Sequence, residues 1–155
     1  DSAGLERIGT YVGKPVAFPS WEAAAAHFAQ LQSAMHPNYR GDDWDRYARR
    51  ICRERDGVIL FDYDMAIADN FQVAIGAPAV DAWPYFHALA GAPLLIVRGE
   101  YSDLLSASTA QAMVDAHPDA ELITVPGVGH APDLVEPAAI AAIDRFLGRI
   151  SGAQN

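Results

Sequence analysis

The stretch GAPLLIVRGEYSDLLSASTAQAMVDAHPDAELITVPGVGHAPDL, residues 91–134, decides the fold, because two apolar runs flank a helical pattern in it. Pro93 to Val97 is a short apolar run, which predicts a strand buried on both faces of a parallel sheet. Ser106 is a natural helix N-cap, and Pro118 is expected to end the helix that follows. Ala120 to Val125 predicts a second strand. The order of strand, helix and strand favours a right-handed parallel crossover.

A polar residue of catalytic type follows each predicted strand. Asp103 lies in a polar turn after the first strand, and His130 ends the turn PGVGH after the second. The carboxyl ends of parallel strands share one edge of a sheet, where α/β folds place their sites. A histidine that activates a nucleophile needs a carboxylate to orient its ring and to stabilise the imidazolium. We therefore predict that Asp103 and His130 are catalytic, although a helix-capping aspartate and a loop histidine would fit the same spacing.

The remaining sequence predicts mainly helices. They are expected over residues 3–12, from Ser20 with Ala24, Phe28, Leu31 and Met35 on one face, from Asp42 or Asp43 to near Gly57, over Met65 to Ile75, and from Pro137 to Ile150. Gly57 to Asp62 is a brief β-prone run, and Ala77 to Gly91 is a segment bounded by prolines. The expected organisation is a helical cap or lid region over residues 1–76, followed by an α/β core portion over residues 77–155.

Composition narrows the class of protein and of partner. The length of 155 residues and the hydrophobic content of 51% fit one domain with a substantial core. The net charge of -9 argues against nucleic acid, whose phosphates require clustered Lys and Arg. The sequence has no signal-peptide pattern and no apolar stretch that would span a bilayer, so no membrane partner and a cytoplasmic location are expected. The single cysteine, Cys52, is expected to be a packed thiol on a helical face rather than a nucleophile.

Two motifs give the chain a family resemblance. RGEYSDLLS at 98–106 and PGVGHAPDL at 126–134 resemble the C-terminal third of α/β-hydrolase-fold enzymes, and Tyr63 to Ala68 is similar to a segment of bacterial members. In that family such an aspartate is the acid of a catalytic triad and such a histidine is its base. The resemblance thus assigns these roles to Asp103 and His130, and the order of acid before histidine agrees. It implies a serine hydrolase that cleaves esters or C–C bonds through an acyl-enzyme, without metal or organic cofactor.

The sequence departs from the family at the nucleophile. No Gly-x-Ser-x-Gly elbow and no His-Gly oxyanion segment occur in it. We therefore expect the nucleophile in a missing N-terminal half of the same fold, upstream of Asp1, and we expect an incomplete sheet. Some relatives use an aspartate nucleophile, which this chain leaves open. Alone, the chain should be inactive and should expose an open strand edge, which favours homo-oligomers or unfolding.

The implied substrate is a small apolar ester-like molecule. The cap region would roof its pocket with aromatic and apolar side chains, although helix-to-helix packing explains each of them equally well. These residues are Trp21, Phe28, Met35, Tyr39 and Trp44. The other histidines, His27, His36, His87 and His117, are expected at helix surfaces or helix ends rather than at a metal.

Two other classes of function remain open at this point. Val58 to Asp64, followed by Asp69, resembles the first motif of haloacid-dehalogenase-type phosphatases, in which Asp62 would be the nucleophile and Asp64 the acid/base beside Mg²⁺. Met65-Ala66 replaces the expected Gly-Thr, and the chain's single lysine, Lys14, lies upstream of the motif. The second alternative is a non-catalytic interaction fragment.

Overall fold

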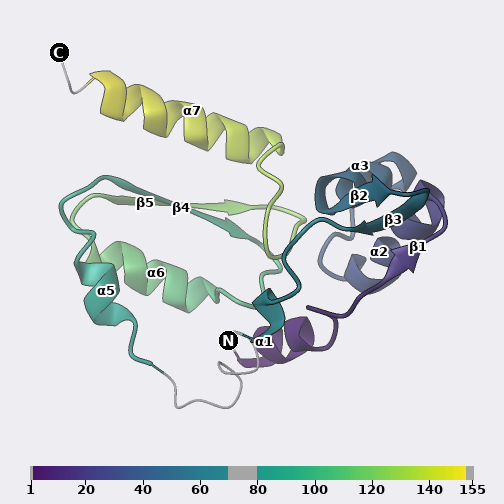
Figure 1. Cartoon of the computed structure of the whole chain (residues 1–155). Helices are drawn as coiled ribbons and strands as arrows, with labels where there is room; N and C mark the ends of the chain where they lie inside the picture. Colours follow the sequence, from purple (N-terminus) through teal and green to yellow (C-terminus); the bar gives the residue numbers. More distant parts are fainter. Residues whose placement is uncertain (1, 70–79, 153–155) are drawn as a thin grey trace. The chain divides into compact units, whose positions relative to one another are not determined.

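The computed structural model describes residues 2–69 and 80–152, and Figure 1 shows its elements. The chain divides into two compact units, residues 2–78 and residues 79–155, called here the N-terminal unit and the C-terminal unit. Within the described ranges, no helix combines the length and the apolar character that crossing a bilayer requires.

The N-terminal unit combines helices with a small antiparallel sheet. Its elements are α1 (Ser2–Gly9), β1 (Ala17–Phe18), α2 (Trp21–Gln32), α3 (Gly41–Ile51), β2 (Cys52–Arg55) and β3 (Val58–Phe61). The strands pair in the order β1-β3-β2. Ser20 caps α2 as predicted, since its Oγ accepts a hydrogen bond from Ala23 N at 3.2 Å. The cap position of α3 is Arg40 rather than Asp42 or Asp43, because Asp43 Oδ2 reaches back to Arg40 N at 2.8 Å.

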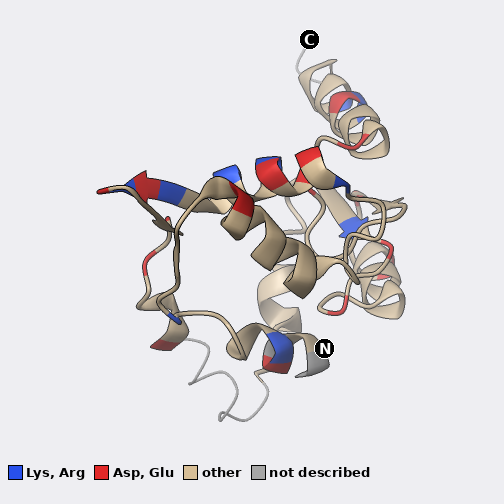
Figure 2. Ribbon diagram, turned by 90° about the vertical axis from the view of Figure 1, so that its right-hand side faces the viewer, with Lys and Arg blue, Asp and Glu red and all other residues tan. Residues whose placement is uncertain are grey.

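The predicted helix from residue 42 to near Gly57 is wrong in its second part. The helix ends at Ile51, and the chain continues as a hairpin of β2 and β3 in which Arg55 pairs with Val58. Asp56 and Gly57 form the two-residue turn with φ of 51° and 77°, the geometry of the turns that match the twist of a hairpin. Acidic and basic residues alternate along β2 (Figure 2), which resembles a solvated helix face in sequence.

An aromatic cluster forms the core of the N-terminal unit. The buried members come from α2, α3 and all three strands: Phe18, Ala24, Phe28, Trp44, Ala48, Cys52 and Ile59. Phe28 lies at its centre, with ring centroids 6.0 Å from Phe18, 5.5 Å from Tyr47 and 5.8 Å from Phe61. Cys52 is buried as predicted, but it begins a strand and does not lie on a helix.

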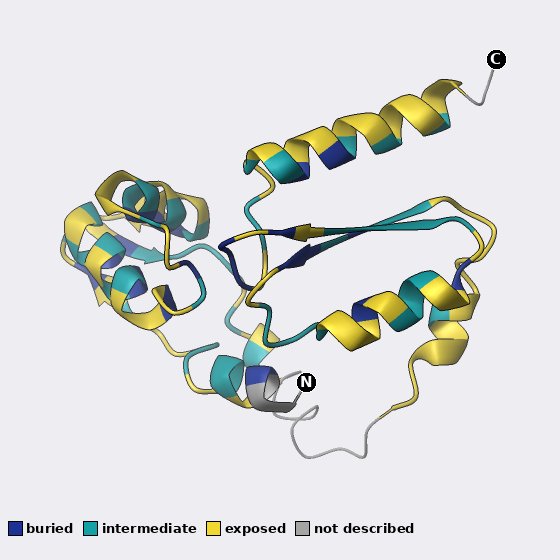
Figure 3. Cartoon of the chain, turned by 180° about the vertical axis from the view of Figure 1, so that it is seen from behind, coloured by how far each residue is buried: buried dark blue, intermediate teal, exposed yellow. Residues whose placement is uncertain are grey.

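The C-terminal unit contains the predicted crossover. Its elements are α5 (Trp83–His87), β4 (Leu94–Gly99), α6 (Ala107–Ala116), β5 (Ala120–Val125) and α7 (Pro137–Gly152). β4 and β5 are parallel, from the pair Leu94 and Ala120 to the pair Gly99 and Val125. Helices α6 and α7 lie on opposite sides of this pair (Figure 1). Each strand ends in a buried residue, Gly99 in β4 and Val125 in β5, and the predicted catalytic turns follow these ends (Figure 3).

Two predicted segments lie partly outside the described residues. Of the helix expected over Met65 to Ile75, residues 67–69 are helical and residues 70–75 are not described. Of the proline-bounded segment from Ala77 to Gly91, the described part contains α5.

Candidate active site

The turn that carries Asp103 is built by short-range hydrogen bonds at the end of β4. Ser102 N donates to Gly99 O at 3.1 Å, and Leu105 N donates to Ser102 Oγ at 3.1 Å. Ser106 then caps α6, because its Oγ accepts from Thr109 N at 3.0 Å. Asp103 is half-buried within this series. The serines of the motif thus fix the backbone on both sides of the carboxylate.

A buried guanidinium forms hydrogen bonds with the backbone of the same turn. Arg98, the penultimate residue of β4, is only 8% exposed. Its Nε donates to Leu105 O at 2.7 Å, and its Nη2 donates to Glu100 O at 3.2 Å. These two bonds hold the backbone before and after Asp103 and offset part of the cost of burying the charge.

The turn that carries His130 follows β5 and contains a glycine with positive φ. Gly127 has φ of 72°, a conformation that favours glycine, and residues 127–129 are buried. His130 is the first exposed residue after them. The sequence PGVGH therefore brings a tight, buried turn back to the surface at the histidine.

The two turns are joined to each other directly. Glu100 N donates to Val125 O and Tyr101 N donates to Val128 O, each at 2.9 Å. The side chain of Glu100 adds a third bond, accepting at Oε2 from Gly127 N at 2.8 Å. A Cβ on Gly99 would overlap the carbonyl oxygen of Gly129, so only glycine permits this approach. The turns that carry Asp103 and His130 thus lie together at the carboxyl edge of the parallel pair.

The sequence motifs predict roles for Asp103 and His130, but the residues that join their turns were not predicted. Arg98, Gly99 and Glu100 stand inside the quoted motif RGEYSDLLS, but only its aspartate was interpreted. The adjacency of a glycine and a carboxylate at a strand end was the available signal. It indicates a close backbone approach with an acceptor beside it.

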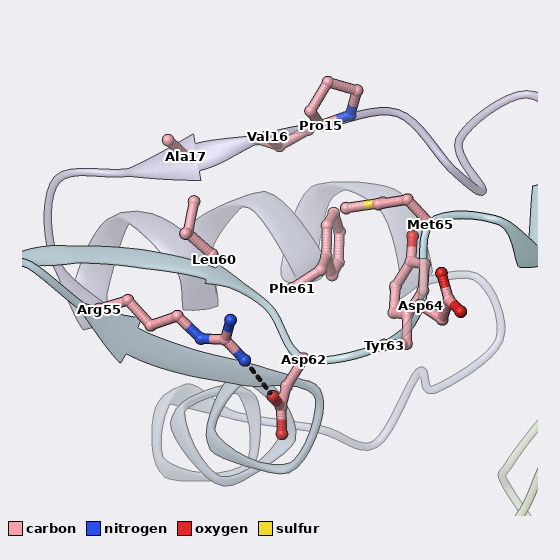
Figure 4. Close-up of a pocket in the computed structure, with 10 residues that line it drawn as sticks. All are labelled: Pro15, Val16, Ala17, Arg55, Leu60, Phe61, Asp62, Tyr63, Asp64 and Met65. Carbon is pink, nitrogen blue, oxygen red and sulfur yellow. Dashed lines mark hydrogen bonds and ion pairs between the residues drawn. The ribbon is translucent and has the colours of Figure 1, made fainter.

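The carboxylates of the alternative phosphatase motif are engaged in structural contacts. Asp62 follows β3, which lies between two antiparallel strands, and forms ion pairs with Arg53 and Arg55. Asp64 Oδ1 accepts from Ala66 N at 2.9 Å. Figure 4 shows Asp62 directed toward Arg55 and the carboxylate of Asp64 directed elsewhere, although both line the same cavity of about 590 Å³. Among the described residues, no group of three or more His, Cys, Asp and Glu is arranged to hold a metal ion.

The N-terminal unit contains a second, mainly apolar cavity of about 350 Å³. Of the residues expected to cover a substrate pocket, Phe28 lines this cavity and also belongs to the aromatic cluster, and Trp44 is buried in that cluster. Trp21 and Tyr39 pack against that cluster.

Two of the remaining histidines, His117 and His36, are buried in structural contacts. His117 ends α6, is 6% exposed, and has Nδ1 as acceptor for Asp119 N at 3.1 Å, with Nε2 beside Leu89 O at 3.1 Å. His36, expected at a helix surface or a helix end, follows the end of α2, where its N donates to Gln32 O at 3.0 Å. It is 2% exposed, among the aromatic rings of Tyr39, Trp44 and Tyr47.

Comparison with known proteins identifies the fold. No protein-family model matches the chain. The chain is 35% identical to the 3-hydroxybutyrate-oligomer hydrolase of Cupriavidus necator, over 94% of this chain and 52% of that protein. It is 49% identical to an α/β hydrolase of Novosphingobium aromaticivorans, with a TM-score of 0.85 over 95% of this chain and 52% of that structure. The structure of E-2-(acetamidomethylene)succinate hydrolase, 24% identical, shares the fold with a TM-score of 0.69 over 96% of this chain and 53% of its own.

These similarities confirm the resemblance read from the two motifs. The chain spans about half the length of the curated relative and of the solved structures it matches. Its sheet of two parallel strands is the incomplete sheet that the motifs predicted, with α6 as the crossover helix and α7 after the second strand. The chain therefore has the fold of a C-terminal portion of an α/β hydrolase.

Proposed function

We propose that this chain supplies the acid and the base of the catalytic triad of a serine ester hydrolase. The joining of the Asp103 turn and the His130 turn by three hydrogen bonds at the edge of the parallel pair carries this proposal. In the proposed reaction a serine attacks the ester carbonyl while His130 takes its proton, and His130 then returns the proton to the leaving alcohol. Asp103 holds the imidazole in one tautomer and stabilises the imidazolium. Water hydrolyses the acyl-enzyme with His130 as base.

The nucleophile is proposed to lie outside these 155 residues. None of the serines of the chain stands in a Gly-x-Ser-x-Gly sequence, and the relatives extend for about as much length again. The protein that contains this chain would then combine a nucleophile and oxyanion donors from the other half of the fold with Asp103 and His130. The proposed reaction requires no metal or organic cofactor.

We propose a short ester of a hydroxy acid as the substrate class. The relative from Cupriavidus necator is a hydrolase of 3-hydroxybutyrate oligomers, whose units are joined by carboxylic esters. We further propose that the N-terminal unit is the cap, and that its apolar cavity of about 350 Å³ receives apolar groups of the substrate.

The test is hydrolysis of the 3-hydroxybutyrate dimer by the full-length protein that contains this chain. His130→Ala and Asp103→Asn should each lower kcat by about a thousandfold or more, because both groups act with the nucleophile as a unit. His87→Ala, which changes an exposed histidine of the same unit, is the control and should retain activity. Full activity of His130→Ala would refute the proposal.

The isolated chain gives a second test. Residues 1–155 alone should not turn over p-nitrophenyl esters, because the proposed nucleophile and oxyanion donors are outside them. Turnover by the pure chain that His130→Ala abolishes would place a nucleophile within these residues and contradict the proposal.

A further inference from the structure

Glu100 takes part in two of the three hydrogen bonds that join the two turns of the candidate site. Its backbone N donates to Val125 O at 2.9 Å, and its backbone carbonyl accepts from Arg98 Nη2 at 3.2 Å. Its side chain crosses to the histidine turn, where Oε2 accepts from Gly127 N at 2.8 Å. One residue of the acid turn therefore contacts the end of β5, the buried arginine and the histidine turn.

The contact with Gly127 lies where the histidine turn is set. Gly127 is buried and lies two residues beyond the end of β5, where its N–H donates to the Glu100 carboxylate and not to the strand ladder. A buried N–H without an acceptor is costly, and a charged acceptor binds it more strongly than a neutral one. Only two residues, Val128 and Gly129, separate Gly127 from His130, so a tilt of this peptide would be transmitted to the imidazole.

We propose that Glu100 is a positioning residue that fixes the His130 turn relative to the Asp103 turn through its bond to Gly127 N. This inference rests on the proposed function, in which Asp103 and His130 act as a pair. The Glu100 side chain acts as a hydrogen-bond acceptor in this role. It is also the link that a substitution can remove without changing the backbone or the proposed pair.

Three variants of the full-length protein separate this role from others. Glu100→Ala removes the acceptor, Glu100→Gln keeps an acceptor oxygen at the same reach without the charge, and Glu100→Asp keeps the charge one methylene shorter. Glu121→Ala is the matched control, because that carboxylate also lies in this unit but binds Arg149. His130→Ala reports separately on the proposed function.

The kinetic expectation is a loss in kcat with KM little changed. Glu100→Ala should lower kcat by about ten- to a hundredfold, the size expected when a catalytic group is displaced by about 1 Å. KM should stay within about twofold. Glu100→Gln should restore most of the loss, Glu100→Asp should restore less, and Glu121→Ala should match the wild type.

A second readout does not depend on activity. Hydrogen exchange of the Gly127 amide, followed by NMR, should accelerate about tenfold or more in Glu100→Ala and remain slow in Glu100→Gln. The amides of β5 should keep their protection. If Glu100→Ala does not fold, Glu100→Gln and Glu100→Asp still provide the test. Glu100→Gln keeps the reach of the acceptor and loses the charge, whereas Glu100→Asp keeps the charge and loses the reach.

The outcomes distinguish the two proposals. Wild-type kcat and slow Gly127 exchange in Glu100→Ala, with His130→Ala inactive, would overturn the positioning role and leave the triad proposal standing. Equal impairment of Glu100→Gln and Glu100→Ala would show that the charge matters rather than the bond, which would also overturn it. If His130→Ala stays active, the proposed function fails, and the Gly127 amide alone then decides whether Glu100 holds the turn.

Discussion

Each of the two units is stabilised internally by a different kind of contact. The N-terminal unit depends on an aromatic cluster in which side chains such as Phe28 and Trp44 fill volume. The carboxyl edge of the C-terminal unit depends instead on hydrogen bonds to backbone atoms around Gly99 and Gly127. Loss of volume should therefore damage the first, whereas added volume should damage the second.

The largest effect is expected from Phe28→Ala. Phe28 is 4% exposed and contacts several rings, so its removal should lower the free energy of unfolding of the N-terminal unit by about 3–5 kcal/mol. Urea unfolding measures the loss, and hydrogen exchange locates it. Amides of α2 and β3 should lose protection while those of β4 and β5 keep it.

Leu31→Ala is the matched control on the same helix. Leu31 is 41% exposed, so the same kind of truncation should cost much less. An equal loss of protection in both units after Phe28→Ala would break the comparison, because it would show one cooperative core.

The next effect concerns the thiol of Cys52 in the same cluster. Burial, and to a smaller extent the charge of Asp62, raises the pKa of this thiol from 9.0 to about 11. At pH 8 the thiolate fraction is then about a hundredfold lower than in the unfolded chain. Alkylation by iodoacetamide should be slower by about that factor in the folded protein than in urea, and equal rates would contradict the burial.

The same shift has a consequence for stability at high pH. The pKa is higher in the folded state, so the native protein keeps the proton that the unfolded chain loses between pH 9 and about 11. The contribution of Cys52 is thus complete below pH 9 and is lost as the pH rises through this window. Cys52→Ala should lose less stability than the wild type across it.

The sequence predicted the C-terminal unit well because its signals are local. Ser106, Pro118 and Pro137 mark helix ends by their own hydrogen bonding and ring geometry, and the structure confirms each of them. Both strands were confirmed, with β4 continuing two residues farther than the predicted run. The roles of Asp103 and His130 remain predictions, because a role depends on groups that no local pattern describes.

The N-terminal unit was harder to predict because pairing there joins distant residues. Cys52 to Arg55 follows α3 without a proline or glycine between them, and its charges continue the helical pattern. What makes it a strand is pairing with Val58 to Phe61 across the Asp56-Gly57 turn. That dipeptide is a hairpin signal, whereas Gly57 alone is equally typical of a helix end.

A smaller effect, of the opposite kind to Phe28→Ala, is expected from Gly99→Ala. The added Cβ would overlap the carbonyl oxygen of Gly129 and lie 2.7 Å from that of Val128, both of them backbone atoms. Overpacking of this kind should cost about 1–3 kcal/mol in urea unfolding. Gly148→Ala in α7 is the control, since its Cβ would meet nothing within 4 Å and should stabilise the helix by about 0.5–1 kcal/mol. A neutral Gly99→Ala would show that the two turns can separate freely.

The smallest effect is expected from Asp62→Asn, which removes charge without changing volume in either unit. Its arginine partners, Arg53 and Arg55, are 68% and 64% exposed, so the ion pairs are screened and should contribute only about 0.2–1 kcal/mol. The difference between variant and wild type should shrink further in 1 M NaCl, where exposed pairs are weakened most. Because the charge of Asp62 is the lesser cause of the raised Cys52 pKa, alkylation of Cys52 should accelerate only slightly in the variant. A loss of several kcal/mol, or alkylation as fast as in urea, would instead make charge rather than aromatic volume the main determinant of the N-terminal unit.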